Sequence, residues 1–250
     1  MQLDEVVSYL DEYLALADVP DYPGALNGLQ VANGGEVTRI AVAVDASEAT
    51  VSAAVDGGFD LLLVHHGLVW DGNRPVTGRR YRRLKPLLEH GVALYAAHLP
   101  LDVHGEVGNN AVLADELGVE VLGRFGAFEG VEIGVWGRLE TTRDALLAQL
   151  EGLLGGPVKL LPGGPEAVER VGVLTGGGGS EIEAARAAGL DAYVTGEGSH
   201  HTYFDAMEGG INVYYGGHYA TEVWGVRALA AHLEERFELP WQFIDRPTGL

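Results

Sequence analysis

The stretch LLLVHHG, residues 61–67, joins a short apolar run to two adjacent histidines. Four consecutive apolar residues are typical of a strand buried on both faces, as in a parallel sheet covered by helices. Working outward, segments 38–44 (TRIAVAV) and 92–97 are further strand candidates, and a helical pattern lies between each pair of successive strands. This alternation predicts an α/β fold with a largely parallel sheet.

A second cycle of strands and helices begins near residue 131. Its predicted strands are 131–139, 171–175, 192–195 and 211–215, and its predicted helices include 142–154 and 220–237. We therefore predict two α/β/α-type repeats with mostly parallel sheets. The first comprises residues 1–124 and is completed by 219–250, and the second comprises residues 125–218.

The charge of the chain restricts its partners. Sixteen basic and 36 acidic residues give a formal net charge of −20. Binding to nucleic acid needs clustered Lys and Arg that neutralise phosphates, so we expect no nucleic-acid partner. Such an acidic surface with few lysines also suggests adaptation to concentrated salt, where repulsion between carboxylates is screened. Codon bias with an acidic tendency is the alternative explanation.

The composition also excludes several kinds of site. The chain has no cysteine, which excludes disulfides, iron–sulfur clusters and thiolate zinc sites. No run of 18 apolar residues is present and the first ten residues lack the basic region of a signal peptide. We therefore expect a cytoplasmic protein without a membrane partner.

Histidines and carboxylates follow the ends of four predicted strands. His65 and His66 follow 61–64, and His98 ends 92–97. Glu197 and His218 come after the strands at 192–195 and 211–215. Ligands of open α/β sheets bind beyond the carboxyl ends of the strands, so these positions indicate a site.

Three of these residues are four positions from a residue of the complementary type, so that a histidine is paired with a carboxylate. The pairs are His98–Asp102, His218–Glu222 and Glu197–His201. Carboxylates are so frequent in this chain that pairs of this spacing also arise by chance, and the positions at strand ends carry more weight.

Imidazole and carboxylate groups together suit Zn, Mn, Fe, Co or Ni. The chain has at least six such groups, which is more than one four-coordinate zinc needs and enough for two metals about 3.5 to 4 Å apart. A cluster of hydrogen-bonded surface histidines remains the alternative.

Other residues have weaker claims to a function. His104 is a candidate for a supporting role beside Asp102, and we expect His232 to be solvated on the last helix. The glycine loop 176–179 is better explained by a tight strand-to-helix turn than by phosphate binding, because it lacks the Lys of a P-loop. A group of arginines follows Trp70, and a phosphorylated substrate or simple charge balance would account for it. These arginines are Arg74, Arg79, Arg80, Arg82 and Arg83.

Five stretches of the chain together resemble the Nif-three-like family, also called the GTP cyclohydrolase I type 2 homologues. They are NGLQV (27–31), VHHGLVW (64–70), HLPLDVHGEVGNN (98–110), TGEGSHH (195–201) and GHYATE (217–222). They occur in family order from one end of the chain to the other, and their combination is far more specific than any single stretch.

The resemblance implies a dinuclear metal centre in a cleft between two α/β repeats, holding two divalent transition metal ions per chain. The implied ligands are His65, His66, His98, Asp102, His218 and Glu222. It further implies that Glu197 and His201 are cleft residues near the metals and that the chain assembles into a homohexamer.

The function implied by the resemblance is a metal-dependent hydrolase similar to GTP cyclohydrolase I type 2. Metal-activated water would attack a nucleotide or related small molecule, with Glu197 or His201 transferring protons. Two alternatives stay open: a metal-handling protein or chaperone, and an oligomeric scaffold that the metals stabilise without catalysis. The sequence names neither the metal nor the substrate.

Overall fold

The computed structural model of the 250-residue chain describes residues 1–70, 72 and 74–250. It divides into two compact units. Unit 1 comprises Met1–Val107 and Val226–Arg246, and unit 2 comprises Gly108–Gly225 and Pro247–Leu250. The repeat boundaries predicted from the sequence lie at 124/125 and 218/219.

Unit 1 is built on a five-stranded sheet with the strand order β1-β4-β3-β2-β11. The strands are β1 (Gly28–Val31), β2 (Ile40–Asp45), β3 (Leu61–His66), β4 (Ala93–Ala96) and β11 (Trp241–Phe243). All neighbours pair in parallel except β1, which runs antiparallel to β4. The predicted largely parallel sheet is therefore confirmed for unit 1, although β1 was missed.

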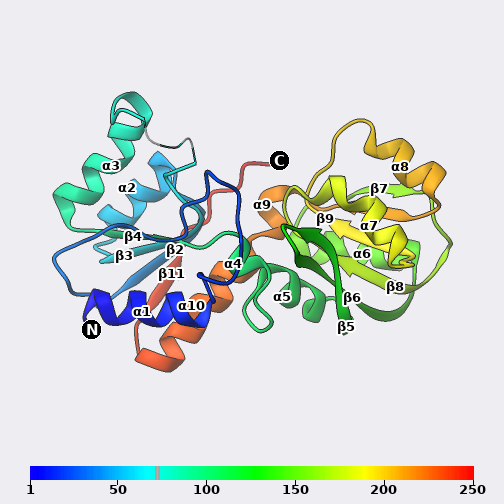
Figure 1. The fold of residues 1–250 in the computed structure, drawn as a ribbon, viewed down its shortest axis with the longest axis horizontal. Helices are drawn as coiled ribbons and strands as arrows, with labels where there is room; N and C mark the ends of the chain where they lie inside the picture. Colours follow the sequence, from blue (N-terminus) through cyan, green and yellow to red (C-terminus); the bar gives the residue numbers. More distant parts are fainter. Residues whose placement is uncertain (71, 73) are drawn as a thin grey trace. The chain divides into compact units, whose positions relative to one another are not determined.

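Helices cover both faces of this sheet (Figure 1). The helices are α1 (Leu3–Tyr13), α2 (Glu48–Asp56), α3 (Gly78–His90), α4 (Leu99–Asp102) and α10 (Val223–Phe237). Side chains alternate along each strand, so Ile40 and Val42 pack under α1 and α10, whereas Ala41 and Ala43 pack under α2 and α3. This alternation explains why the strands are apolar at nearly every position.

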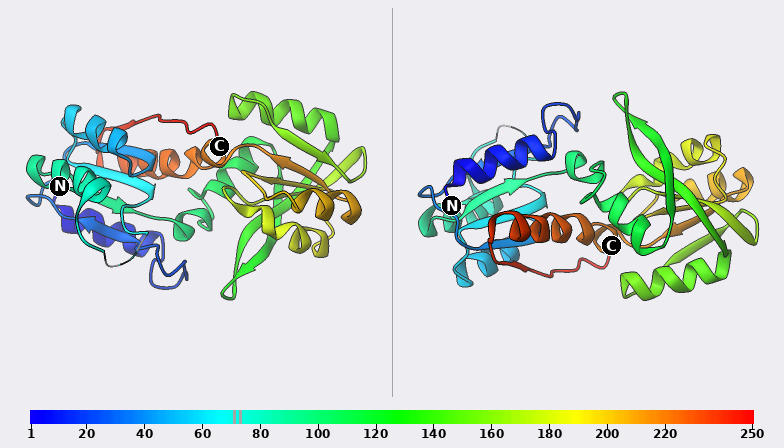
Figure 2. Two further views of the ribbon diagram at one scale, coloured as in Figure 1. Left: turned by 90° about the horizontal axis from the view of Figure 1, so that it is seen from above. Right: turned by 90° about the horizontal axis from the view of Figure 1, so that it is seen from below.

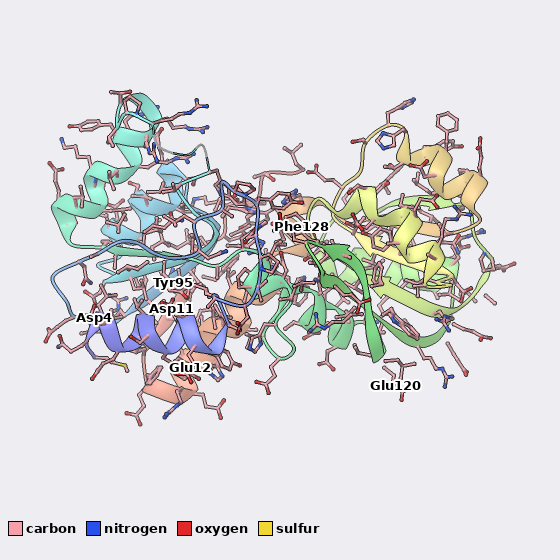
Figure 3. All side chains as sticks on the ribbon, in the orientation of Figure 1. Asp4, Asp11, Glu12, Tyr95, Glu120 and Phe128 are labelled. Atoms are coloured by element: carbon pink, nitrogen blue, oxygen red, sulfur yellow. The ribbon has the colours of Figure 1, made fainter. Side chains whose placement is uncertain are left out.

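A buried hydrogen bond joins α1 to the sheet. Tyr95 of β4 is fully buried, and its hydroxyl donates to Oδ1 of Asp11 over 2.8 Å (Figure 3). A buried tyrosine hydroxyl requires such an acceptor. Burial, followed by the charge of Asp11, raises the pKa of Tyr95, so the hydroxyl keeps its proton and the bond persists.

Unit 2 contains a six-stranded sheet with the order β5-β6-β8-β9-β10-β7. The strands are β5 (Glu120–Phe128; both ends labelled in Figure 3), β6 (Val131–Thr142), β7 (Lys159–Pro162), β8 (Ala167–Val173), β9 (Ala192–Thr195) and β10 (Asn212–Tyr215). Only β8–β9 and β9–β10 pair in parallel. The prediction of mostly parallel sheets is therefore wrong for this unit.

One of the three antiparallel strand pairs in this sheet is a hairpin that the sequence pattern did not reveal. Strands β5 and β6 pair antiparallel along their length and form the long ribbon visible in Figure 2. Glu129 and Gly130 connect them with φ angles of 48° and 91°. Two consecutive residues with positive φ are what a tight two-residue hairpin requires. The hairpin occupies the segment where we predicted the change of repeat.

Helices lie on both faces of the second sheet as well (Figure 2). They are α5 (Asn109–Glu116), α6 (Arg143–Leu154), η1 (Gly178–Glu181), α7 (Ile182–Ala187), α8 (Thr202–Gly209) and α9 (His218–Thr221). The predicted helix 220–237 is interrupted at Glu222, where α9 ends and α10 begins. Ser180, which follows the glycine loop 176–179, lies inside η1. Among the described residues, every helix is too short or too polar to cross a membrane.

Candidate metal centre

Three histidines of unit 1 meet at the carboxyl ends of two adjacent parallel strands. Strand β3 ends in His65 and His66, and His98 follows the end of β4 by two residues. One ligand atom from each of the three lies within 4.8 Å of the others. His65 is buried and the other two are half-buried. The structure therefore brings together three residues that strand ends had indicated.

Asp102 joins this cluster through helix α4. The helix starts directly after His98, so Asp102 lies one turn further along the chain. Its Oδ2 is 3.6 Å from Nε2 of His65, and the residue is only 8% exposed. A buried carboxylate is stable when it faces a cation or a donor, and the imidazole of His65 lies against this one.

Hydrogen bonds set the orientation of the first two histidine rings. Nδ1 of His65 lies 2.8 Å from the carbonyl oxygen of Ala97, and Nδ1 of His66 lies 3.0 Å from Oδ1 of Asp45. The sheet register explains the second contact, since Asp45 and His66 are partners at the ends of β2 and β3. In both rings the proton on Nδ1 points to an oxygen, and Nε2 is the nitrogen offered to the cluster.

The third ring is held by a loop that precedes the sheet. Nδ1 of His98 lies 2.7 Å from Oδ1 of Asp21. The other oxygen of Asp21 accepts from Asn27 Nδ2 and from the Leu99 amide, and Asn27 Oδ1 accepts from the His98 amide. Burial opposes ionisation of Asp21, but the hydrogen bond and charge of His98, with the Asn27 bond, outweigh it and lower the pKa of Asp21.

Unit 2 contributes two further groups that could bind a metal ion, His218 and Glu222. Nε2 of His218 lies 3.2 Å from Oε1 of the buried Glu222, and Nδ1 of His218 lies 2.8 Å from Oε1 of Glu197. Glu197 and His218 follow the neighbouring parallel strands β9 and β10, which places them side by side. The hydrogen bond to Glu222, against the effect of burial and with the help of Glu197, raises the pKa of His218 to about 9.

The glycine loop 176–179 contacts this pair. A Cβ on Gly176 would lie 2.0 Å from Oε1 of Glu222 and 3.4 Å from Nε2 of His218, and the residue has a φ of +67°. Its amide donates to Thr221 Oγ1, and the Gly179 amide donates to the carbonyl oxygen of Glu197. The loop therefore makes room for the donors, and these two amides bond within the protein.

Two other residues predicted from the sequence, His201 and His104, have different surroundings. His201 is exposed directly before α8, and among the described residues no hydrogen bond joins its side chain to His218 or Glu222. His104 closes its own loop: Nδ1 accepts from the amides of Glu106 and Val107, and Nε2 donates to the carbonyl of Tyr13. These bonds turn His104 toward α1.

Sequence reasoning missed two supporting carboxylates, Asp21 and Asp45. Asp45 had a detectable signal, because it follows a buried strand directly and so lies at the same sheet edge as His66. Asp21 had none, because it comes from a loop whose path no periodicity reveals. Asn27 belongs to the stretch NGLQV that carried part of the family resemblance. Its side-chain amide donates a hydrogen bond to Asp21, which gives this residue a structural role.

The donor set fits a transition metal on structural grounds. Metal-bound histidines characteristically give their second ring nitrogen to a carboxylate or a backbone carbonyl, which fixes the tautomer. All four histidines, His65, His66, His98 and His218, show this arrangement through Nδ1. Imidazole with carboxylate is a ligand chemistry suited to the later first-row divalent ions.

Fold and donors together define an α/β protein whose strand ends carry histidine and carboxylate groups able to bind a metal ion. The chain belongs to the Duf34/NIF3 (NGG1p interacting factor 3) family, whose model matches residues 1–248. The family resemblance found in the sequence is thus confirmed.

Known relatives match along almost the whole chain. A Deinococcus radiodurans protein named "GTP cyclohydrolase 1 type 2 homolog" is 45% identical over 249 residues, covering 99% of this chain and 94% of its own. A Halobacterium salinarum protein of the same name is 46% identical over 256 residues, with both chains fully covered. The solved structure of TTHA1606 from Thermus thermophilus superposes with a TM-score of 0.90 at 44% identity, again with both chains fully covered.

Proposed function

We propose that this protein is a metal-dependent hydrolase of a nucleotide or related small molecule, with two divalent transition metal ions per chain. The observation that supports it most is the shared Nδ1 bonding of the four histidines, which leaves Nε2 as the metal-binding nitrogen in each. The names of the relatives, GTP cyclohydrolase 1 type 2 homologs, support the reaction class.

The proposed ligands come from both units. Unit 1 contributes His65, His66, His98 and Asp102, and unit 2 contributes His218 and Glu222. Zn, Fe, Mn, Co and Ni all suit this mixture of imidazole and carboxylate. When bound, such an ion would lower the pKa of a coordinated water to about 7 and so supply a nucleophile at neutral pH.

The protein groups beside the ligands would position them and handle protons. Glu197 accepts a hydrogen bond from His218 Nδ1, so it orients that imidazole toward Glu222. This gives Glu197 a positioning role in addition to the proton transfer that we predicted for it. A proton-transfer role for His201 remains a prediction, and a His201→Ala variant with full metal content but reduced turnover would support it.

The decisive experiment measures metal per chain and turnover on the same sample. The protein is purified without chelator or affinity metal and analysed by elemental mass spectrometry. It is then incubated with GTP and other nucleotides. We expect about two ions per chain, with turnover lost on chelation and restored by one particular ion. A full metal load without turnover would favour metal handling or a scaffold, and little metal after reloading would contradict the proposal.

A double variant tests the ligand assignment itself. His65→Ala with His218→Ala removes one imidazole from each unit, so we expect stoichiometric metal to be lost while circular dichroism still shows a folded α/β protein. His90→Ala is a control, because His90 is an exposed residue at the end of α3. Two ions per chain in the double variant would show that the assignment is wrong. Assembly into a homohexamer remains a prediction of the resemblance, and light scattering tests it.

A further inference from the structure

A basic cavity lies in unit 1 immediately after the histidine pair. It encloses about 330 Å³ and begins at Gly67, the residue that follows His66. Four arginines contribute to its wall, namely Arg74, Arg79, Arg80 and Arg83. In a chain of net charge −20, four guanidinium groups around one cavity are an unusual concentration of positive charge. Guanidinium groups recognise phosphate through paired hydrogen bonds, which makes this cavity a candidate anion site.

Helix α3, which supplies three of the four arginines, also favours an anion in this cavity. Helix α3 begins after Thr77, which also lines the cavity, and its first turn contains no acidic residue. The N-terminus of a helix already carries a partial positive charge, and arginines there are electrostatically unfavourable. Arg79 and Arg80 nevertheless occupy the first turn. An anion bound at this end of the helix would interact favourably with both guanidinium groups and with the helix dipole.

Two of the arginines on α3 have clearly different surroundings. Arg82 points away from the cavity and forms two hydrogen bonds of 2.9 Å with the carboxylate of Glu48 on α2. Arg80 donates to the carbonyl oxygens of Arg74 and Gly72, which fixes its guanidinium group at the cavity wall. An arginine held in this way loses little conformational entropy when a ligand binds.

Trp70 connects the cavity with the histidine cluster. It lines the cavity, and its ring packs edge-on against His98, with the ring centroids 4.8 Å apart. Its centroid is also 5.8 Å from that of His66. A molecule with an anionic group among the arginines would therefore have its remaining part beside Trp70 and the proposed metal ligands.

We infer that this cavity binds the phosphate groups of the substrate, which is accordingly a phosphorylated small molecule such as a nucleotide. Several arginines suit the multiple charges of a di- or triphosphate better than a single carboxylate. The connection to turnover rests on the proposed function, whereas the binding of phosphate by the cavity does not.

Calorimetric titration with pyrophosphate tests the cavity separately from the metals. The full chain is first stripped of metal with a chelator, because phosphate also coordinates metal ions. We expect binding that weakens with salt, and a loss of at least about tenfold in affinity in the variant R79A/R83A. R82A is a control on the same helix: it removes one guanidinium group that lies outside the cavity, and we expect its affinity to stay within about twofold of the wild type.

The outcomes separate this inference from the proposed function. R79A/R83A should keep the metal content of the wild type, which elemental analysis measures. The inference is overturned if the metal-free wild type does not bind pyrophosphate, or if R82A weakens binding as much as R79A/R83A. Absence of metal from the wild type would contradict the proposed function and leave the pyrophosphate result to decide the cavity. The milder pair R79Q/R83Q repeats the test if R79A/R83A does not fold.

Discussion

Asp21 and His98 are 77 positions apart in the chain, yet Oδ1 of Asp21 lies 2.7 Å from Nδ1 of His98. The carboxylate also accepts from Asn27 and from the Leu99 amide, so its own orientation is fixed. A carboxylate bonded to the far nitrogen of a ligand histidine sets the tautomer of the ring and increases its basicity. Asp21 is therefore a positioning residue for the proposed metal ligand His98.

The variant D21N should weaken metal binding without removing a ligand. The neutral amide is a poorer acceptor for Nδ1–H, and we expect the metal affinity to fall by about 10- to 100-fold. Competition with a chromogenic chelator measures the change. D18N is the control, because Asp18 is exposed in the same segment. An unchanged affinity in D21N would show that His98 needs no support from Asp21.

The pH behaviour of His218 provides a second prediction. In the metal-free protein its pKa is raised to about 9 by Glu222 and, to a smaller extent, by Glu197. The ordinary value is about 6.5, so the charged ring stabilises the folded state. This contribution is fully present below about pH 6.5 and is lost as the pH rises through about 9.

Replacing Glu197 should lower the pKa of His218. NMR titration of the histidine ring protons in metal-free protein measures it, and E197Q should move it down toward the ordinary value because one charged partner is gone. E208Q changes an exposed glutamate on α8 in the same unit and should leave the pKa unchanged. Equal pKa values in E197Q and the wild type would contradict the interaction.

The sequence pattern predicted those residues of the candidate site that follow the end of a strand. The apolar run 61–64 followed by His65, and the strand before His98, place two of the proposed ligands at one sheet edge by topology alone. Asp21 could not be found this way, because its position depends on the tertiary path of a loop. The hairpin β5–β6 was missed because its turn, Glu129–Gly130, has a non-glycine residue at positive φ in place of the usual Asn-Gly or Asp-Gly.

His232 is a second residue whose tertiary contacts the sequence pattern did not predict, here on the surface of a helix. Helical spacing suggested a solvated residue, but a neighbouring helix covers it. Nε2 of His232 lies 2.5 Å from the hydroxyl of Tyr9, and its ring stacks on Tyr13 with centroids 4.2 Å apart. The expectation of a solvated side chain was wrong, because sequence periodicity does not reveal which partner a half-polar face will meet.

The variant H232A should destabilise unit 1 and leave metal binding intact. It removes a hydrogen bond and an aromatic stack between α1 and α10, and we expect a loss of about 1 to 3 kcal/mol in the free energy of unfolding. Y9F removes only the hydrogen bond and should cost about 0.5 to 1.5 kcal/mol. Urea denaturation measures both. E235A, at an exposed position on the same helix, is the control, and a loss in H232A no larger than in E235A would refute the role.

Gly176 gives the sharpest steric prediction for unit 2. A Cβ at this position would lie 2.0 Å from Oε1 of Glu222, well inside van der Waals contact, and the φ of +67° is strained for alanine. G176A should therefore displace Glu222 from His218 and reduce metal content, even though it alters no ligand. The expected cost in stability is at least about 1 kcal/mol.

The neighbouring glycine is a matched control for this variant. A Cβ on Gly177 would meet only Cε1 of His218 at 3.8 Å, an ordinary contact, and its φ is negative. G177A therefore makes the same chemical change one residue away without the clash. Elemental analysis should show full metal in G177A and a deficit in G176A. If both variants kept full metal, Glu222 would tolerate displacement, and its assignment as a ligand would lose its support.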